Sequence, residues 1–276
     1  MTRHWAIAIG IEAYLWLDYL PTARQDAVMF RALLLSEQSY NQIYCFANID
    51  LDNVLDEGIA ISSQPTFANL KEFLQLRFIT PFLNPGDVLW FFFSGHGLHF
   101  ANRDYLMLSD SKPDAPEHTA IALEDLVECL RRSGTNNIVL LLDACRTEYQ
   151  QFGQGFGTDP VDVVTVFASD FNQTAQSIDE LHHGSFTYVL LEGLRSLSEK
   201  DHPNLQQLYQ YLCDRIPQLN RQYAKPSQSP RLRDDAPTLS HAIPIPPVSD
   251  RDEELLTSIL VQQHLQEAAM GNLPLW

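Results

Sequence analysis

The sequence contains few cysteines and no long apolar run. Its 276 residues include four cysteines, and none of them forms a Cys-x-x-Cys pair. This spacing argues against a zinc knuckle and against a thioredoxin-type redox motif. No uninterrupted apolar stretch reaches the roughly 18 residues that a membrane-spanning helix needs, and the first apolar run is too short and too early for a signal peptide. We therefore expect a cytoplasmic protein that keeps its thiols reduced and has no membrane partner.

Basic residues are also scarce. The chain has 18 lysines and arginines against 35 aspartates and glutamates, so its formal net charge is −17. Such a chain would repel the phosphates of a nucleic acid, and we expect no nucleic-acid partner. The negative charge could attract basic peptides. Alternatively, the charge only keeps the protein in solution.

Several short apolar runs do not alternate with polar residues, a pattern typical of parallel strands that are buried on both faces. Helical patterns lie between these runs. The repeated order of strand, helix and strand predicts an α/β fold, a three-layer α/β/α sandwich with a mainly parallel sheet of about six strands. The predicted strands cover residues 5–9, 43–46, 88–93, 138–142 and 163–168, and the predicted helices cover 26–35, 67–78 with Thr66 as N-cap, 123–132, 186–197 and 205–216.

The C-terminal part of the chain has a different composition. Residues 225–235 are rich in Pro, Ser, Arg and Asp and predict a loop, and residues 239–243 predict one more strand at the sheet edge. Three prolines, at 244, 246 and 247, then predict a linker, and residues 252–270 have the composition of a helix with acidic residues at its start. We therefore expect one domain over residues 1–244, followed by a Pro-rich linker and a C-terminal helical tail over 245–276.

Polar motifs follow two of the apolar runs. The run VLWFFF leads into residues 94–97 (SGHG), and the run NIVLLL leads into residues 143–146 (DACR). Functional residues of α/β sheets lie just past the carboxyl ends of the strands. If the two strands are neighbours, His96 and Cys145 meet at one edge of the sheet, where the imidazole can take the proton of the thiol. The Gly97 and Cys145 amides could then form an oxyanion hole, and the glycines that flank His96 would let the backbone approach the substrate.

A lone histidine at a strand end is usually a polar loop residue, and a lone cysteine after an apolar run is usually part of the core. Their pairing at matching strand ends, 49 residues apart, is much more specific. With these two motifs the chain resembles the caspase-like clan of cysteine peptidases, and most closely the bacterial metacaspase-like (orthocaspase) proteins. The resemblance spans roughly residues 5–244 and rests on SGHG at 94–97, DACR at 143–146, RDYL at 103–106, IGI at 9–11, LP at 20–21, DA at 26–27, ASD at 168–170, QTA at 173–175 and HGSFT at 183–187. It implies a caspase-like fold, with Cys145 as nucleophile and His96 as general base.

The resemblance also suggests how the substrate is selected. Metacaspases cut after Arg or Lys with acidic pocket residues, whereas animal caspases cut after Asp with arginines. Asp26 stands where the metacaspase-like pattern has an acidic residue, although it could equally be the N-cap of the following helix. Asp170 lies near the second acidic position, which Phe171 could occupy instead.

Three further residues near these motifs have open roles. Asp143, at the buried end of its strand, is expected to bind backbone amides or to shape the pocket floor rather than to act as a third catalytic residue. Arg24 and Arg146 are the candidate arginines for a pocket that binds Asp. Because Arg146 follows the nucleophile directly, a structural or substrate-side role fits it better.

A calcium site is a weaker possibility, suggested because metacaspases often need calcium. The acidic residues that invite it have spacing that fails the EF-hand pattern, with Val54 where a ligand should be and Gly58 out of place, so a solvated acidic loop is the better interpretation. They are Asp50, Asp52, Asp56 and Glu57. We also expect His99, His182 and His183 to be loop residues and Cys45, Cys129 and Cys213 to lie in the core.

The sequence therefore predicts a cysteine endopeptidase with a Cys–His dyad, whose partner is a protein or peptide with a basic residue before the scissile bond. We expect a monomer that works as an intact chain, with any self-cleavage near Arg231 or Arg233. The C-terminal helix could bind an activating partner, as in a regulated effector of bacterial cell death or defence. The alternatives are a non-enzymatic interaction module with a caspase fold and an Asp-specific peptidase.

Overall fold

The structure is a computed structural model and describes residues 2–35, 40–49, 52–56, 58–146, 163–170, 172–198, 200–234, 239–245 and 248. Its centre is a mixed sheet in which six strands follow the order β12-β9-β8-β5-β1-β2. These strands are β1 (His4–Gly10), β2 (Tyr40–Phe46), β5 (Val88–Phe100), β8 (Asn137–Arg146), β9 (Val163–Phe167) and β12 (Arg231–Asp234). All neighbours along this path are parallel except β12 and β9, which are antiparallel.

Two short strands and several small elements extend this sheet or lie outside it. The antiparallel strands β6 (Arg103–Leu106) and β7 (Ile121–Ala122) extend the sheet from the far end of β5. Two-stranded ribbons are formed by β3 (Asn53–Val54) with β4 (Ala60–Ile61) and by β10 (Ser177–Ile178) with β11 (His183–Gly184). The short helices are α3 (Pro116–Thr119), η1 (Asp179–Leu181) and α7 (Leu239–Ala242).

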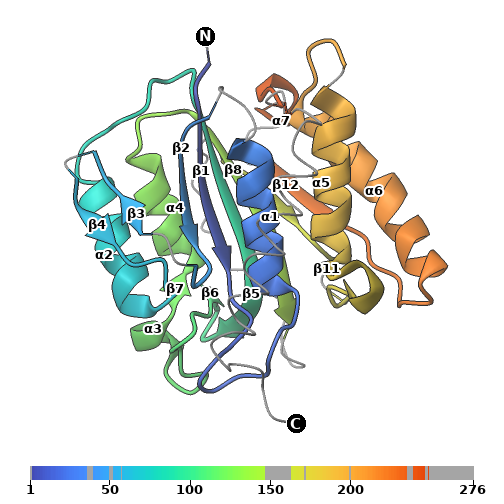
Figure 1. The fold of residues 1–276 in the computed structure, drawn as a ribbon, viewed down its shortest axis with the longest axis horizontal. Coiled ribbons are helices and arrows are strands. Elements are labelled where there is room, and N and C mark those ends of the chain that lie inside the picture. The colour runs from blue at the N-terminus through green and yellow to red at the C-terminus, as the bar shows by residue number, and fades with distance from the viewer. Residues whose placement is uncertain are drawn as a thin grey trace, which may run out of the picture.

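Helices cover both faces of the sheet, which is why the central strands are apolar without alternation. One face packs Trp90 and Phe92 of β5 against α1 (Ala23–Leu35), α5 (Ser185–Ser198) and α6 (Leu205–Gln222). The other face packs Phe91 and Phe93 against α2 (Phe67–Arg77) and α4 (Leu123–Arg131). Figure 1 shows the strands in the middle, with α2 and α4 on one side and α5 and α6 on the other. The predicted three-layer α/β/α fold is confirmed.

Two predictions about the C-terminal part of the fold are wrong. Residues 231–234, expected in a loop, form the edge strand β12, because Leu232 packs partly against the core while the charged residues around it hide the strand pattern. Residues 239–243, expected to be a strand, begin with the helix α7, whose Ser240 amide donates to Asp234 Oδ2 at 3.0 Å. The linker prolines at 246 and 247 and the predicted tail helix over 252–270 lie outside the described residues, so the domain boundary stays a prediction.

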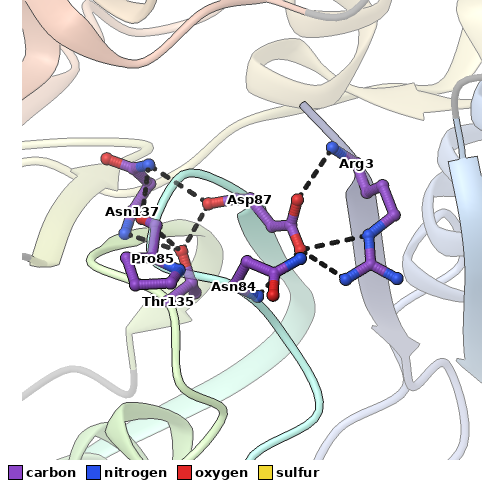
Figure 2. A network of polar contacts seen from close by, with 6 residues as sticks. All are labelled: Arg3, Asn84, Pro85, Asp87, Thr135 and Asn137. Carbon is purple, nitrogen blue, oxygen red and sulfur yellow. Dashed lines mark hydrogen bonds and ion pairs between the residues drawn. The ribbon is translucent and has the colours of Figure 1, made fainter. Parts of the chain in front are cut away.

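A polar network joins the starts of three strands at the amino end of the sheet (Figure 2). The Asp87 carboxylate accepts hydrogen bonds from the backbone and guanidinium of Arg3, just before β1, at 2.9–3.2 Å. It also accepts the Asn84 amide at 2.9 Å. The Asp87 carbonyl accepts bonds from Thr135 and Asn137, at the start of β8. These bonds fix β1, β5 and β8 relative to one another at the end opposite the SGHG and DACR motifs.

Within the described ranges, no helix is both long enough and apolar enough to cross a bilayer.

Candidate active site

The SGHG and DACR motifs lie side by side in the sheet. The sequence suggested that the motifs come after the ends of their strands. Instead, the two polar segments continue the parallel pairing of β5 with β8, so the motifs lie within the strands. Ser94 pairs with Asp143, and His96 pairs with Cys145. Neighbouring strands lie about 4.8 Å apart, so the backbone of Cys145 is directly beside that of His96. The predicted meeting of these two positions is therefore present in the register of the strands.

His96 is buried, with 6% of its surface exposed, and its ring is held on one side by a loop. Its Nε2 lies 2.9 Å from the carbonyl oxygen of Asp18, in the connection between β1 and α1. Because a carbonyl can only accept, Nε2 carries the proton and Nδ1 presents a lone pair. Among the described residues, Nδ1 has no hydrogen-bond partner.

Burial also sets the protonation of this histidine. It lowers the pKa of His96, because the charged imidazolium loses hydration, although the Asp18 carbonyl acts in the opposite direction. At neutral pH this shift favours the neutral form of the ring. A neutral imidazole with an unpartnered basic nitrogen is the form that can accept a proton from a nucleophile.

The two glycines that flank His96 differ in what they do. Gly97 lies in β5, in register with Leu106 of β6 and with Arg146 of β8. The structure shows why residue 95 is a glycine, and the reason is not the expected approach of the backbone to the substrate. A Cβ added there would lie 2.6 Å from Tyr14 Oη and 2.8 Å from the ring of Phe93. Gly95 is therefore required by the packing behind the motif.

Asp26 is not the N-cap of its helix, because α1 begins three residues earlier, at Ala23. Its buried carboxylate instead reaches across to the start of α5 and to the sheet. Oδ1 lies 2.7 Å from His183 Nδ1, Oδ2 accepts the Ser94 hydroxyl at 3.1 Å, and both oxygens accept the Gly184 amide at 3.3 Å. Asp26 thus joins α1, β5 and β11.

Asp143 is the second buried carboxylate of this cluster. Its Oδ2 accepts the Thr187 hydroxyl at 2.7 Å. Burial, followed by the negative charge of Asp26, raises the pKa of Asp143 to about 7. Gly184 lies against both carboxylates, since a Cβ there would be 2.6 Å from Asp143 Oδ2 and 3.2 Å from Asp26 Oδ2. The structure therefore brings Asp26 and Asp143 together.

This acidic pair lies close to the His96 and Cys145 positions. Asp143 is two residues before Cys145 on β8, and Ser94, which binds Asp26, is two residues before His96 on β5. Two residues of a strand span roughly 6.6 Å. The acidic pair therefore lies roughly 6.6 Å along the strands from the predicted dyad.

Other predicted site residues are placed elsewhere or are not described. Asp170 is exposed in the turn after β9. The charge of Asp170 acts on Tyr209: burial raises the pKa of Tyr209 to about 12, and the Asp170 charge is one of the lesser causes. The Arg24 Nε donates to the Ala47 carbonyl at 3.1 Å. The Arg146 side chain and Phe171 lie outside the described part of the chain.

Two histidines that were expected in loops have structural partners. His183 lies in β11 and contacts Asp26, and the HGSFT run at the start of α5 was the available signal for it. His99 lies in β5, where its Nδ1 is 2.7 Å from Asp104 Oδ1. Sequence reasoning missed the first of these because His183 and Asp26 are 157 residues apart.

The structure describes only part of the acidic loop that suggested a calcium site. Asp56 forms an ion pair with Arg77 at 3.2 Å. No group of three or more candidate metal ligands occurs in the described ranges. Asp50 and Glu57 lie outside them.

Comparison with known proteins places the chain in a family. The sequence profile of the caspase domain matches residues 3–238, so the chain belongs to the caspase domain family. The crystal structure of caspase-1 from Spodoptera frugiperda superposes with a TM-score of 0.52 at 12% identity, covering 84% of this chain and 86% of that one. A structure of pro-sf-caspase-1 gives a TM-score of 0.55 at 13% identity, with coverage of 85% and 88%. No curated protein matches the sequence. The caspase-like fold confirms the predicted resemblance to the caspase-like clan and points to cysteine peptidase activity.

Proposed function

We propose that this protein is a cysteine endopeptidase in which Cys145 is the nucleophile and His96 the general base. The observation that carries the proposal is the register of Cys145 with His96, combined with the unpartnered Nδ1 of a neutral His96 ring. The Asp18 carbonyl supports it by holding the proton on Nε2. In this arrangement the ring accepts a proton without first losing one.

The proposed reaction has two steps. Nδ1 of His96 takes the thiol proton, and the sulfur attacks the scissile carbonyl carbon to give a tetrahedral oxyanion, which the Gly97 and Cys145 amides would stabilise. Collapse breaks the C–N bond, and the leaving amine takes the proton from His96, which leaves a thioester. A water molecule that gives a proton to Nδ1 then hydrolyses the thioester, and His96 returns that proton to the sulfur.

We propose that cleavage follows Arg or Lys. Support comes from the buried acidic pair, Asp26 and Asp143, beside the dyad positions. A cation between the two carboxylates would offset their mutual repulsion, and each charge-assisted hydrogen bond is worth roughly 1.5–3 kcal/mol. Arg24 donates to a backbone carbonyl, which does not favour an arginine pocket for Asp. The exposed Asp170 is a further candidate for contact with the substrate.

With a preference for Arg or Lys, this protein would resemble the metacaspase-like and orthocaspase proteins more than the animal caspases in the substrates it cuts. It is also compatible with a regulated effector of bacterial defence or cell death. Control by a partner would act through residues beyond 245, which lie mostly outside the described part of the chain.

The test is a peptidase assay on the purified protein with fluorogenic peptides ending in Arg, Lys or Asp, with and without calcium. We expect the Arg and Lys peptides to be cut. The Cys145→Ala variant should lose this activity, and His96→Ala should lose on the order of 10²–10⁴ in rate. Wild-type turnover by Cys145→Ala would contradict the nucleophile, and cutting of the Asp peptide alone would contradict the acidic pocket.

A further inference from the structure

Tyr14, in the connection between β1 and α1, contacts the backbone and the ring of His96. The His96 amide donates to Tyr14 Oη at 2.9 Å, and the hydroxyl donates to the Met107 carbonyl at 3.5 Å. The Tyr14 ring meets the His96 ring edge-on, with centroids 4.8 Å apart. Tyr14 therefore holds both the main chain and the side chain of this residue.

The hydroxyl of Tyr14 replaces one bond of the β5–β6 ladder. The two strands are antiparallel and pair Gly97 with Leu106, so His96 and Met107 are the next partners. The Met107 amide donates directly to the His96 carbonyl at 3.0 Å. The reciprocal bond, from the His96 amide to the Met107 carbonyl, passes through Tyr14 Oη. The hydroxyl thus keeps the two backbones apart at the position where the imidazole begins.

The same connection also holds the far side of the ring, through the Asp18 carbonyl on Nε2. The space for the Tyr14 hydroxyl exists because residue 95 is glycine, where a Cβ would lie 2.6 Å from Oη. Tyr14, Asp18 and Gly95 therefore form one unit that fixes where His96 Nδ1 points.

We propose that Tyr14 is a positioning residue for His96: its hydroxyl spaces β5 from β6, and its ring sets the orientation of the imidazole towards the Cys145 position. This inference rests on the proposed peptidase function. It adds a residue that acts on the reaction only through the general base.

The decisive variant is Tyr14→Phe, which keeps the ring and removes the hydroxyl. The His96 amide then loses its acceptor, and the backbone relaxes towards a direct bond with Met107. Small displacements of a reacting group cost as much as 10²-fold in rate, so we expect kcat to fall by about 10-fold to 100-fold. KM should stay within about twofold, because Tyr14 has no role in the acidic pair that would bind the substrate cation.

The matched control is Tyr209→Phe, which removes another tyrosine hydroxyl that donates to a backbone carbonyl, that of Pro230 at 3.4 Å. This variant should keep its kcat, and thermal unfolding of both variants measures any general loss of stability. Equal kcat in Tyr14→Phe, Tyr209→Phe and the wild-type protein would overturn the proposal. So would a loss in Tyr14→Phe that appears in KM alone.

A second readout needs no substrate. The imidazole of His96 is titrated by NMR, with its signals assigned from their absence in His96→Ala. In Tyr14→Phe we expect the ring to shift with its backbone relative to the Asp18 carbonyl, so that its titration midpoint moves away from the wild-type value. An unchanged midpoint would overturn the role of Tyr14, whether or not the protein cuts peptides. A shifted midpoint in a protein that cuts no peptide would support the role of Tyr14 and refute only the peptidase function.

Discussion

At the scale of single residues, the four cysteines differ in how readily they form thiolates. Cys45 is buried, and its burial raises the pKa of its thiol to about 12. Burial also raises the pKa of Cys129 and of Cys213. Cys145, by contrast, is in register with His96, the histidine that we propose accepts its proton. The reactive thiolate at neutral pH should therefore be at Cys145.

This contrast gives the first prediction. A thiol-reactive peptide ending in Arg should label Cys145 first, and the His96→Ala variant should be labelled more slowly because the proton acceptor is gone. Peptide mass spectrometry after limited reaction identifies the labelled cysteine. Earlier labelling of Cys213, which is less buried than Cys45 and Cys129, would contradict the assignment.

The second prediction concerns the raised pKa of Asp143, which is about 7 in the folded protein and about 3.9 in an unfolded chain. Between these values the folded state binds the proton and the unfolded state does not, so Asp143 costs stability as the pH rises from about 4 to about 7. The Asp143→Asn variant lacks this cost. Its free energy of unfolding, relative to the wild-type protein, should rise across this range by an amount on the order of a few kcal/mol.

Urea unfolding of both proteins at pH 5 and pH 8 measures this difference. The control is Asp170→Asn, which removes a carboxylate at an exposed position, and its difference from the wild-type protein at each pH gives the effect of losing a surface carboxylate. A constant difference for Asp143→Asn would mean that Asp143 is not a buried partner of Asp26.

At the scale of elements, the network around Asp87 gives the third prediction. Burial acts to raise the pKa of Asp87, but the hydrogen bonds from Asn84 and Arg3 together hold the pKa below its usual range. This stabilisation is therefore present above the ordinary pKa and is lost as the pH falls through the folded value. Asp87→Asn should lower the free energy of unfolding by about 1.5–3 kcal/mol at pH 7, the usual worth of hydrogen bonds to a charged group.

The effect of Asp87→Asn should be confined to stability. Asp87 precedes β5, whereas His96 lies nine residues further along the strand, roughly 30 Å away. Unfolding in urea at pH 7 and at pH 3 tests the pH dependence, and kcat/KM at pH 7 tests the distance argument. A fall in kcat/KM of tenfold or more would show that the amino end of the sheet also positions the dyad.

The elements that could be predicted from the sequence are those whose signal is local. The run at Val88–Phe93 is apolar throughout because both faces of β5 are covered, and Thr66 caps α2 through the Asn69 amide at 3.3 Å. The strand β12 could not be predicted, because an edge strand is held by pairing with β9 and only Leu232 marks its inner face.

The same limit applies to the site. That residues 96 and 145 lie side by side could be predicted, because each comes soon after the apolar run of its strand and the pairing of β5 with β8 then brings them together. The partners of Asp26 could not, since His183 and Gly184 come from the far end of the chain and only the fold brings them to α1. Tyr14 was missed for a similar reason: its contact with His96 spans 82 residues.

At the scale of the whole molecule, β12 changes where self-cleavage is expected. Arg231 and Arg233, proposed from the sequence as cleavage sites in a loop, are paired with Phe167 and Thr165 of β9. The Arg231 guanidinium also lies 4.1 Å from the centre of the Phe167 ring. A peptidase needs an extended substrate that is free of other pairing, so cleavage at this strand would first require its removal from the sheet.

The last prediction is that the protein works as an intact monomer. The edge strand β12 carries the charges of Arg231, Arg233 and Asp234, and charged edge strands disfavour pairing between sheets of two molecules. Intact mass measurement of the active protein should therefore give the uncut chain, and light scattering on a sizing column should give the mass of one chain. Specific activity should not depend on protein concentration. A dominant product cut between residues 146 and 162, with activity appearing only after that cut, would defeat the first part, and activity that rises with dimer formation would defeat the second.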